Sequence, residues 1–181
     1  MLNKTRAIEI LHKNMQSPNL RKHCYAVSIA LEGIYDYLEK SKMLDANSPS
    51  RETYGVLGII HDSDYELTKD DWSKHTLLEL EWLKGEGISE DDPLYKAIQS
   101  HNNKITGQRE PQTQMEWALE CCDELTGFIV ACALIGPTKK LDPVDLQFMK
   151  KRWKEKAFAR GVIREQTEQV EEKMKIPLDE F

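Results

Sequence analysis

The sequence predicts an all-α protein, folded as a compact single-domain array of helices. Apolar residues recur at the 3.6-residue spacing of amphipathic helices along most of the chain, and no segment of any length alternates with the period of a strand. The ends of the periodic segments carry ordinary helix-capping residues. A chain of 181 residues that is 40% hydrophobic can bury one substantial core, so we expect one domain over residues 1–181.

The N-terminal half is predicted to form five helices. The first follows the apolar spacing of KTRAIEILHKNM, and Ser17 with Pro18 supplies the N-cap and first residue of the second. The apolar segment ETYGVLGIIHD forms the third, and the turn-prone SDYELTKDDWS separates it from HTLLELEWLKGEG, which stops at its glycines. Pro93 opens the fifth, PLYKAIQSHN. The predicted ranges are 4–15, 18–40, 52–62, 75–87 and 93–102.

The C-terminal half is predicted to form three more helices. Thr113 and Glu116 have capping-box spacing at the start of QMEWALECCDELTGFIVACALI. The apolar run in this helix is shorter than the roughly 20 residues that are needed to span a bilayer. This helix ends at Gly136, and the next begins after Asp142 and Pro143. A charged helix finishes the chain. The predicted ranges are 114–135, 144–159 and 162–175.

Composition narrows the class of partner and the compartment. The formal net charge of -6 disfavours a large nucleic-acid surface or binding to an anionic membrane. The four cysteines form no CxxC or secretory framework, and no signal peptide is visible at the N-terminus. We therefore expect free thiols and a cytoplasmic protein that binds no membrane.

Two histidines are predicted to point from their helices toward the core, and an aspartate follows one of them at the helix end. His23 shares a face with Val27 and Ile34, the inward stripe of an amphipathic helix. His61 ends the apolar segment GIIHDSDYE, and Asp62 follows it directly. Two side chains that can bind a metal, His61 and Asp62, are therefore expected at the edge of the core, where the apolar segment ends.

Asp123 gives the strongest indication of a metal. It lies on the same helical stripe as Leu119, Thr126, Val130 and Leu134, so we expect its carboxylate to be buried. An ionised carboxylate buried without a partner costs several kcal/mol, and no Lys or Arg occupies this stripe. Imidazoles and carboxylates together suit Zn, Fe, Mn, Co or Ni. A metal ion would satisfy Asp123 together with the two histidines and Asp62.

His75 and His101 lie between the HD pair and Asp123 in sequence. One begins a predicted helix and the other ends one, so both can reach a pocket from its rim. Four histidines and two aspartates exceed what one ion needs from protein, which makes a bridged pair of ions plausible, with Asp62 as the bridge. A helix-start residue and a helix C-terminal residue are the ordinary alternatives for these two histidines.

The ligand order resembles that of a known family. His23, then His61 and Asp62 as HD, then Asp123, in an all-α chain of this size, resembles the HD-domain superfamily of metal-dependent phosphohydrolases. The histidines in KHTLLELEWL and AIQSHN match the members with the order H, HD, H, H, D, which usually hold two metal ions. HDSDYE, DELTGFIVACALIGP and KAFARGVIRE look like a branch of small bacterial-type predicted hydrolases. The HD-GYP motif is missing, so cyclic-dinucleotide hydrolysis is not implied.

The resemblance implies a fold, a reaction and a set of roles. It covers a core at about 19–136, with 137–181 as a C-terminal helical extension packed on that core. The implied reaction is hydrolysis of a phosphate ester or anhydride of a nucleotide or other small phosphorylated metabolite, with one or two divalent ions (Fe, Mn, Zn, Co or Ni). The predicted metal ligands are His23, His61, Asp62, His75, His101 and Asp123. Asp62, His75 and His101 are the predicted catalytic residues, and Asp64 is expected to orient a ligand histidine.

A cationic segment supplies candidates for binding phosphate. KKRWKEKAFARGVIR concentrates positive charge in an otherwise acidic protein, and Lys156 or Arg164 could hold a substrate phosphate. A solvated helix face is the ordinary explanation for such a run. The cysteines and tryptophans are expected to pack, and His12 has no expected role.

Two other functions stay open at this stage. One is a non-haem di-iron HD-type oxygenase, since some HD-fold proteins share the ligand pattern of the hydrolases but activate oxygen. The other is a non-catalytic HD module that binds a metal or a nucleotide. Substrate, metal identity and oligomeric state are not determined by the sequence.

Overall fold

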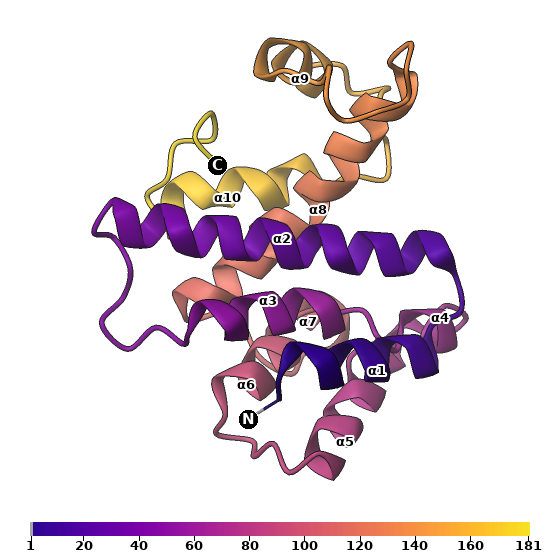
Figure 1. The fold of residues 1–181 in the computed structure, drawn as a ribbon, viewed down its shortest axis with the longest axis vertical. Helices are drawn as coiled ribbons and strands as arrows, with labels where there is room; N and C mark the ends of the chain where they lie inside the picture. Colours follow the sequence, from indigo (N-terminus) through magenta and orange to yellow (C-terminus); the bar gives the residue numbers. More distant parts are fainter. Residues whose placement is uncertain (1) are drawn as a thin grey trace. The chain divides into compact units, whose positions relative to one another are not determined.

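The structure, a computed structural model, describes residues 2–181 and is all-α, as predicted. Within this range no strand is formed, and no helix is both long and apolar enough to cross a membrane. The helices, labelled in Figure 1, are α1 (Lys4–Asn14), α2 (Pro18–Lys40), α3 (Arg51–Ile60), α4 (Tyr65–Thr68), the 3₁₀ helix η1 (Trp72–Lys74), α5 (Leu77–Gly85), α6 (Pro93–Ser100), α7 (Asn103–Thr106), α8 (Gln114–Ile135), α9 (Leu146–Trp153) and α10 (Arg164–Lys173).

The chain forms two compact units, Met1–Leu119 and Glu120–Phe181. The first contains α1 to α7 with η1, and the second contains α9 and α10. Helix α8 begins in the first unit and ends in the second. The prediction of one domain with a core at about 19–136 stays a prediction.

In the first unit, α3 lies between its neighbours at very close range. Seven consecutive residues of this helix, 54–60, are buried, and α3 contacts both α1 and α2. A Cβ added to Gly58 would lie 2.4 Å from the Cα of Ser28 on α2. The Ser28 hydroxyl donates a hydrogen bond to the carbonyl of Gly55, at 2.7 Å. This contact of α2 with α3 brings the rings of His23 and His61 to 5.3 Å between centroids.

Two segments predicted as loops contain short helices. Residues 63–73 form α4 and begin η1, and Asn103–Thr106 form α7 within the polar stretch after His101. Asn102, with φ 57°, turns the chain between α6 and α7. These short helices border the histidines of the candidate site.

In the second unit, α9 is shorter than predicted. The helix expected over 144–159 ends at Trp153, and the one expected over 162–175 starts at Arg164. The Arg164 guanidinium explains the break between α9 and α10, because it binds backbone carbonyl oxygens that would accept helical hydrogen bonds if α9 continued. Its N–H groups donate to the carbonyls of Trp153, Glu155 and Phe158 at 2.9, 3.3 and 2.7 Å.

The core of the second unit is aromatic. Phe128 on α8 packs edge-to-face against Trp153 and Phe158, with ring centroids 4.7 and 5.6 Å apart. The Arg164 guanidinium carbon lies 5.3 Å from the centroid of the Phe128 ring. Trp153 is therefore a packing residue, as predicted. All four cysteines of the chain are buried, and none of them forms a disulfide.

Candidate metal centre

His61 is held in one tautomer at the end of α3. The ring is fully buried, and its Nδ1 lies 2.9 Å from the carbonyl oxygen of Gly58, one turn earlier. A carbonyl only accepts hydrogen bonds, so Nδ1 carries a proton, and when the ring is neutral Nε2 carries the lone pair. Nε2 is directed toward the next residue, at 3.7 Å from Oδ2 of Asp62. The apolar helix thus ends by presenting an imidazole nitrogen to a carboxylate.

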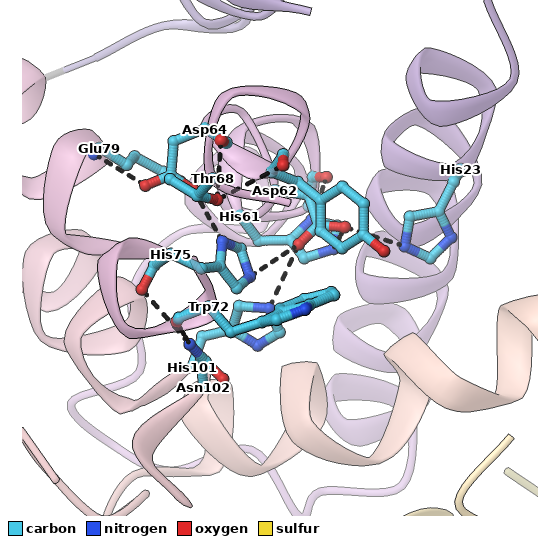
Figure 2. A network of polar contacts seen from close by, with 12 residues as sticks. His23, His61, Asp62, Asp64, Thr68, Trp72, His75, Glu79, His101 and Asn102 are labelled. Atoms are coloured by element: carbon cyan, nitrogen blue, oxygen red, sulfur yellow. Dashed lines mark hydrogen bonds and ion pairs between the residues drawn. The ribbon is translucent and has the colours of Figure 1, made fainter. Parts of the chain in front are cut away.

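Four imidazoles surround the Asp62 carboxylate, which is 7% exposed. Oδ2 of Asp62 lies 3.6 Å from Nε2 of His23 and 3.7 Å from Nε2 of His61. Oδ1 lies 3.2 Å from Nε2 of His75 and 3.4 Å from Nε2 of His101. Each oxygen therefore faces two imidazoles, and all five residues belong to the first unit (Figure 2).

The ionisation of Asp62 and of His75 depends on their neighbours in this cluster. Burial alone would raise the pKa of Asp62, but the charge of His61 and hydrogen bonds from His101 and His75 outweigh it and hold this pKa well below its ordinary value. Burial lowers the pKa of His75, but its hydrogen bonds to Asp62 and Asp64 outweigh burial and raise this pKa to about 9. In the metal-free protein, a proton on His75 therefore supplies the positive charge that the buried carboxylates need.

Asp64 joins His75 to the start of α5. Its side chain is fully buried, and Oδ1 lies 2.7 Å from Nδ1 of His75. Oδ2 accepts a hydrogen bond from the backbone N–H of Glu79 at 3.3 Å. The buried carboxylate therefore fixes the orientation of the His75 ring, and the expected role of Asp64 beside a metal ligand stays a prediction.

The same contact replaces an ordinary helix cap. Thr76 and Glu79 have capping-box spacing, but Thr76 has φ 76° and its side chain makes no capping hydrogen bond. Asp64 caps α5 instead, from 15 residues upstream. The start of α5 and the orientation of His75 therefore depend on one buried carboxylate.

The rim residues His75 and His101 are tied together through the backbone. The Asn102 amide donates to the carbonyl of Trp72 at 3.0 Å and to that of His75 at 3.4 Å (Figure 2). The rings of His75 and His101 are 5.3 Å apart between centroids. The residues directly after η1 and directly after α6 thus form one side of the cluster.

A metal ion fits these side chains. His61, Asp62 and His101 are all buried, and each offers a ligand atom within 4.8 Å of the others. Two imidazoles and a carboxylate suit a divalent transition metal, as the sequence predicted. The buried cluster can therefore hold an ion.

No family model, curated protein or solved structure matches the chain. The candidate centre is therefore described by its own geometry.

Glu79 is a buried carboxyl near the centre that the sequence analysis missed. It is 1% exposed, and burial together with the negative charges of Asp64 and Asp62 raises its pKa well above the ordinary value. Burial and its acidic neighbours therefore both disfavour the ionised form of Glu79. A carboxylate in the first turn of a helix resembles an ordinary surface partner of the helix dipole, so the sequence carried no sign of its burial.

Three predicted site residues lie in the second unit, and their roles stay predictions. Asp123 is half-buried on α8, and its carbonyl accepts a hydrogen bond from the Thr126 hydroxyl at 2.8 Å. Lys156 is exposed, and the Nε and Nη2 groups of Arg164 donate to backbone carbonyls.

The stripe that placed Asp123 inward is only partly buried. Leu119 and Thr126 are buried, but Val130 and Leu134 are 44% and 58% exposed. Asp123, whose carboxylate was expected to be buried, is only half-buried, because apolar periodicity shows which residues share a face and not what covers it.

Proposed function

We propose that the protein is a metal-dependent phosphohydrolase of the HD-domain superfamily, acting on a small phosphorylated metabolite. The observation that supports this most is the position of four imidazole Nε2 atoms around the Asp62 carboxylate, two facing each oxygen. A buried carboxylate flanked on both sides by imidazoles suits a bridging ligand.

His61, Asp62 and His101 would hold one ion, since their ligand atoms already lie together. His23 and His75 would complete the ligand set, with Asp62 available to a second ion through its other oxygen. Asp123 remains the proposed ligand from α8. When bound, a divalent ion supplies Lewis-acid chemistry, lowering the pKa of water to about 7 and stabilising negative charge on phosphate oxygens.

The protein side chains have their own tasks in this proposal. The Gly58 carbonyl accepts a hydrogen bond from Nδ1 of His61, which keeps Nε2 available as a ligand. Asp64 does the same for His75 by accepting from Nδ1. Because Asp64 is fully buried, water does not compete for this hydrogen bond. His75 and His101 then approach the reacting phosphate from the rim, as ligands or as proton donors to the leaving group.

The test combines metal content with turnover. Protein purified without chelator should contain one or two equivalents of transition metal per chain by elemental analysis, and should release phosphate from members of a phosphomonoester, phosphodiester and nucleotide panel. His75→Ala and His101→Ala should lose most turnover. His12→Ala is the matched control, because the exposed His12 ring contacts the Tyr25 hydroxyl and none of the cluster contacts above involves it, so this variant should keep full activity.

Two results would overturn the proposal. One is a metal-loaded protein that leaves the whole panel untouched. The other is full turnover and full metal content in both rim variants. Oxygen uptake without phosphate release would favour the di-iron oxygenase alternative instead.

A further inference from the structure

Trp72 is a large aromatic side chain left exposed beside the metal cluster. It is 43% exposed, yet its ring lies 6.0 Å from the His75 ring between centroids, at an interplanar angle of 83°. The Tyr65 ring lies 4.9 Å away on another side. One part of the indole therefore packs beside the His75 ring (Figure 2), while another part is exposed to solvent.

The position of Trp72 is set by hydrogen bonds to its own short helix. Asp71 caps η1 by accepting from the backbone N–H and hydroxyl of Ser73, at 3.3 and 2.6 Å. The Asn102 amide donates to the Trp72 carbonyl at 3.0 Å. The indole is thus presented from a fixed backbone.

Two exposed apolar side chains lie on the short helices that contact η1. Leu67 on α4 is 57% exposed and Ile105 on α7 is 55% exposed, and both helices contact η1. Exposed apolar surface next to a site with polar ligands is typical of a ligand-binding wall. A flat, partly exposed indole suits a planar ring, and it offers few hydrogen bonds to a polyhydroxylated group.

We propose that Trp72 is the stacking surface for the leaving group of the substrate, and that it selects phosphate esters of a nucleoside over those of a sugar alone. This inference rests on the proposed phosphohydrolase function. A nucleotide carries its base one sugar ring away from its phosphate. The Trp72 ring lies beside His75, a member of the cluster that would receive the phosphate. Aromatic side chains stack on any nucleobase, so the preference is for a base and not for one particular base.

The kinetic test compares a nucleoside 5′-monophosphate with ribose 5-phosphate, in which a hydroxyl stands in place of the base. The metal-loaded native protein should prefer the nucleotide. Trp72→Leu should lower kcat/KM for the nucleotide about tenfold, chiefly through KM, and change that for ribose 5-phosphate less than about twofold. Trp72→Phe should restore most of the loss. An equal fall for both substrates, or no preference in the native protein, would overturn the inference.

Binding provides a readout that does not require turnover. Addition of the nucleoside monophosphate should quench the tryptophan fluorescence of the native protein and of Trp82→Phe, but not of Trp72→Phe. Equal quenching in Trp72→Phe would overturn the stacking role. If no phosphate ester is hydrolysed at all, the proposed function fails, and the quenching experiment still decides whether Trp72 binds the base.

Discussion

Replacing Asp64 with asparagine tests whether this buried carboxylate controls the metal affinity of the cluster. An asparagine amide has one oxygen and one NH₂ group, whereas both neighbours of Asp64, the His75 Nδ1–H and the Glu79 backbone N–H, are donors. One of the two contacts must therefore become a contact between donors, and the negative charge beside His75 is lost.

The expected loss follows from the burial of this pair. The Asp64 and His75 side chains are 0% and 4% exposed, so water does not replace the missing acceptor. A hydrogen bond to a charged group contributes about 1.5–3 kcal/mol. Removing the partner of a metal-ligating histidine weakens metal binding by about 10- to 100-fold, which is about 1.4–2.7 kcal/mol and agrees with the first figure.

The assay is competition for the metal with a chromophoric chelator at fixed pH. Asp71→Asn is the matched control, because Asp71 is in the same segment and loses the same charge, but its carboxylate is 46% exposed and contacts Ser73 and Lys74. Circular dichroism checks that both variants fold. Metal binding by Asp64→Asn within about twofold of the native protein would refute the reasoning.

Three further predictions follow from other contacts. Because the pKa of His75 is raised from 6.5 to about 9, metal binding at neutral pH should release its proton if His75 is a ligand. Calorimetry in buffers of different ionisation enthalpy measures this release. The same shift stabilises the metal-free fold fully below pH 6.5, and this stabilisation is lost as the pH rises through about 9. Since burial disfavours ionised Glu79, Glu79→Gln should raise the melting temperature of the metal-free protein more at pH 8 than near pH 4.5, and an equal change at both would contradict its raised pKa. Gly58→Ala would push a Cβ against the backbone of Ser28 and should lower the free energy of unfolding in urea by about 2 kcal/mol, whereas Gly33→Ala, with open space around it, should not lower it.

Much of the fold was predictable from the sequence because helices depend on local signals. The Ser17–Pro18 start of α2 is present as expected, with the Ser17 hydroxyl accepting from the Leu20 N–H. The end of α9 was not predictable, because it depends on carbonyl groups that bind Arg164, a residue beyond the end of that helix. Apolar spacing carries no information about such contacts.

The sequence by itself determined the helical class and the kinds of side chain that could bind a metal, since apolar periodicity and the HD pair are local properties of the chain. Only the tertiary structure decided that each Asp62 oxygen faces two imidazoles, that Asp64 caps α5 in place of Thr76, and that Glu79 is buried beside them. These facts depend on contacts between residues far apart in sequence and on the left-handed turn at Thr76. The low-dielectric surroundings that shift the charges of the cluster arise only when those residues pack together.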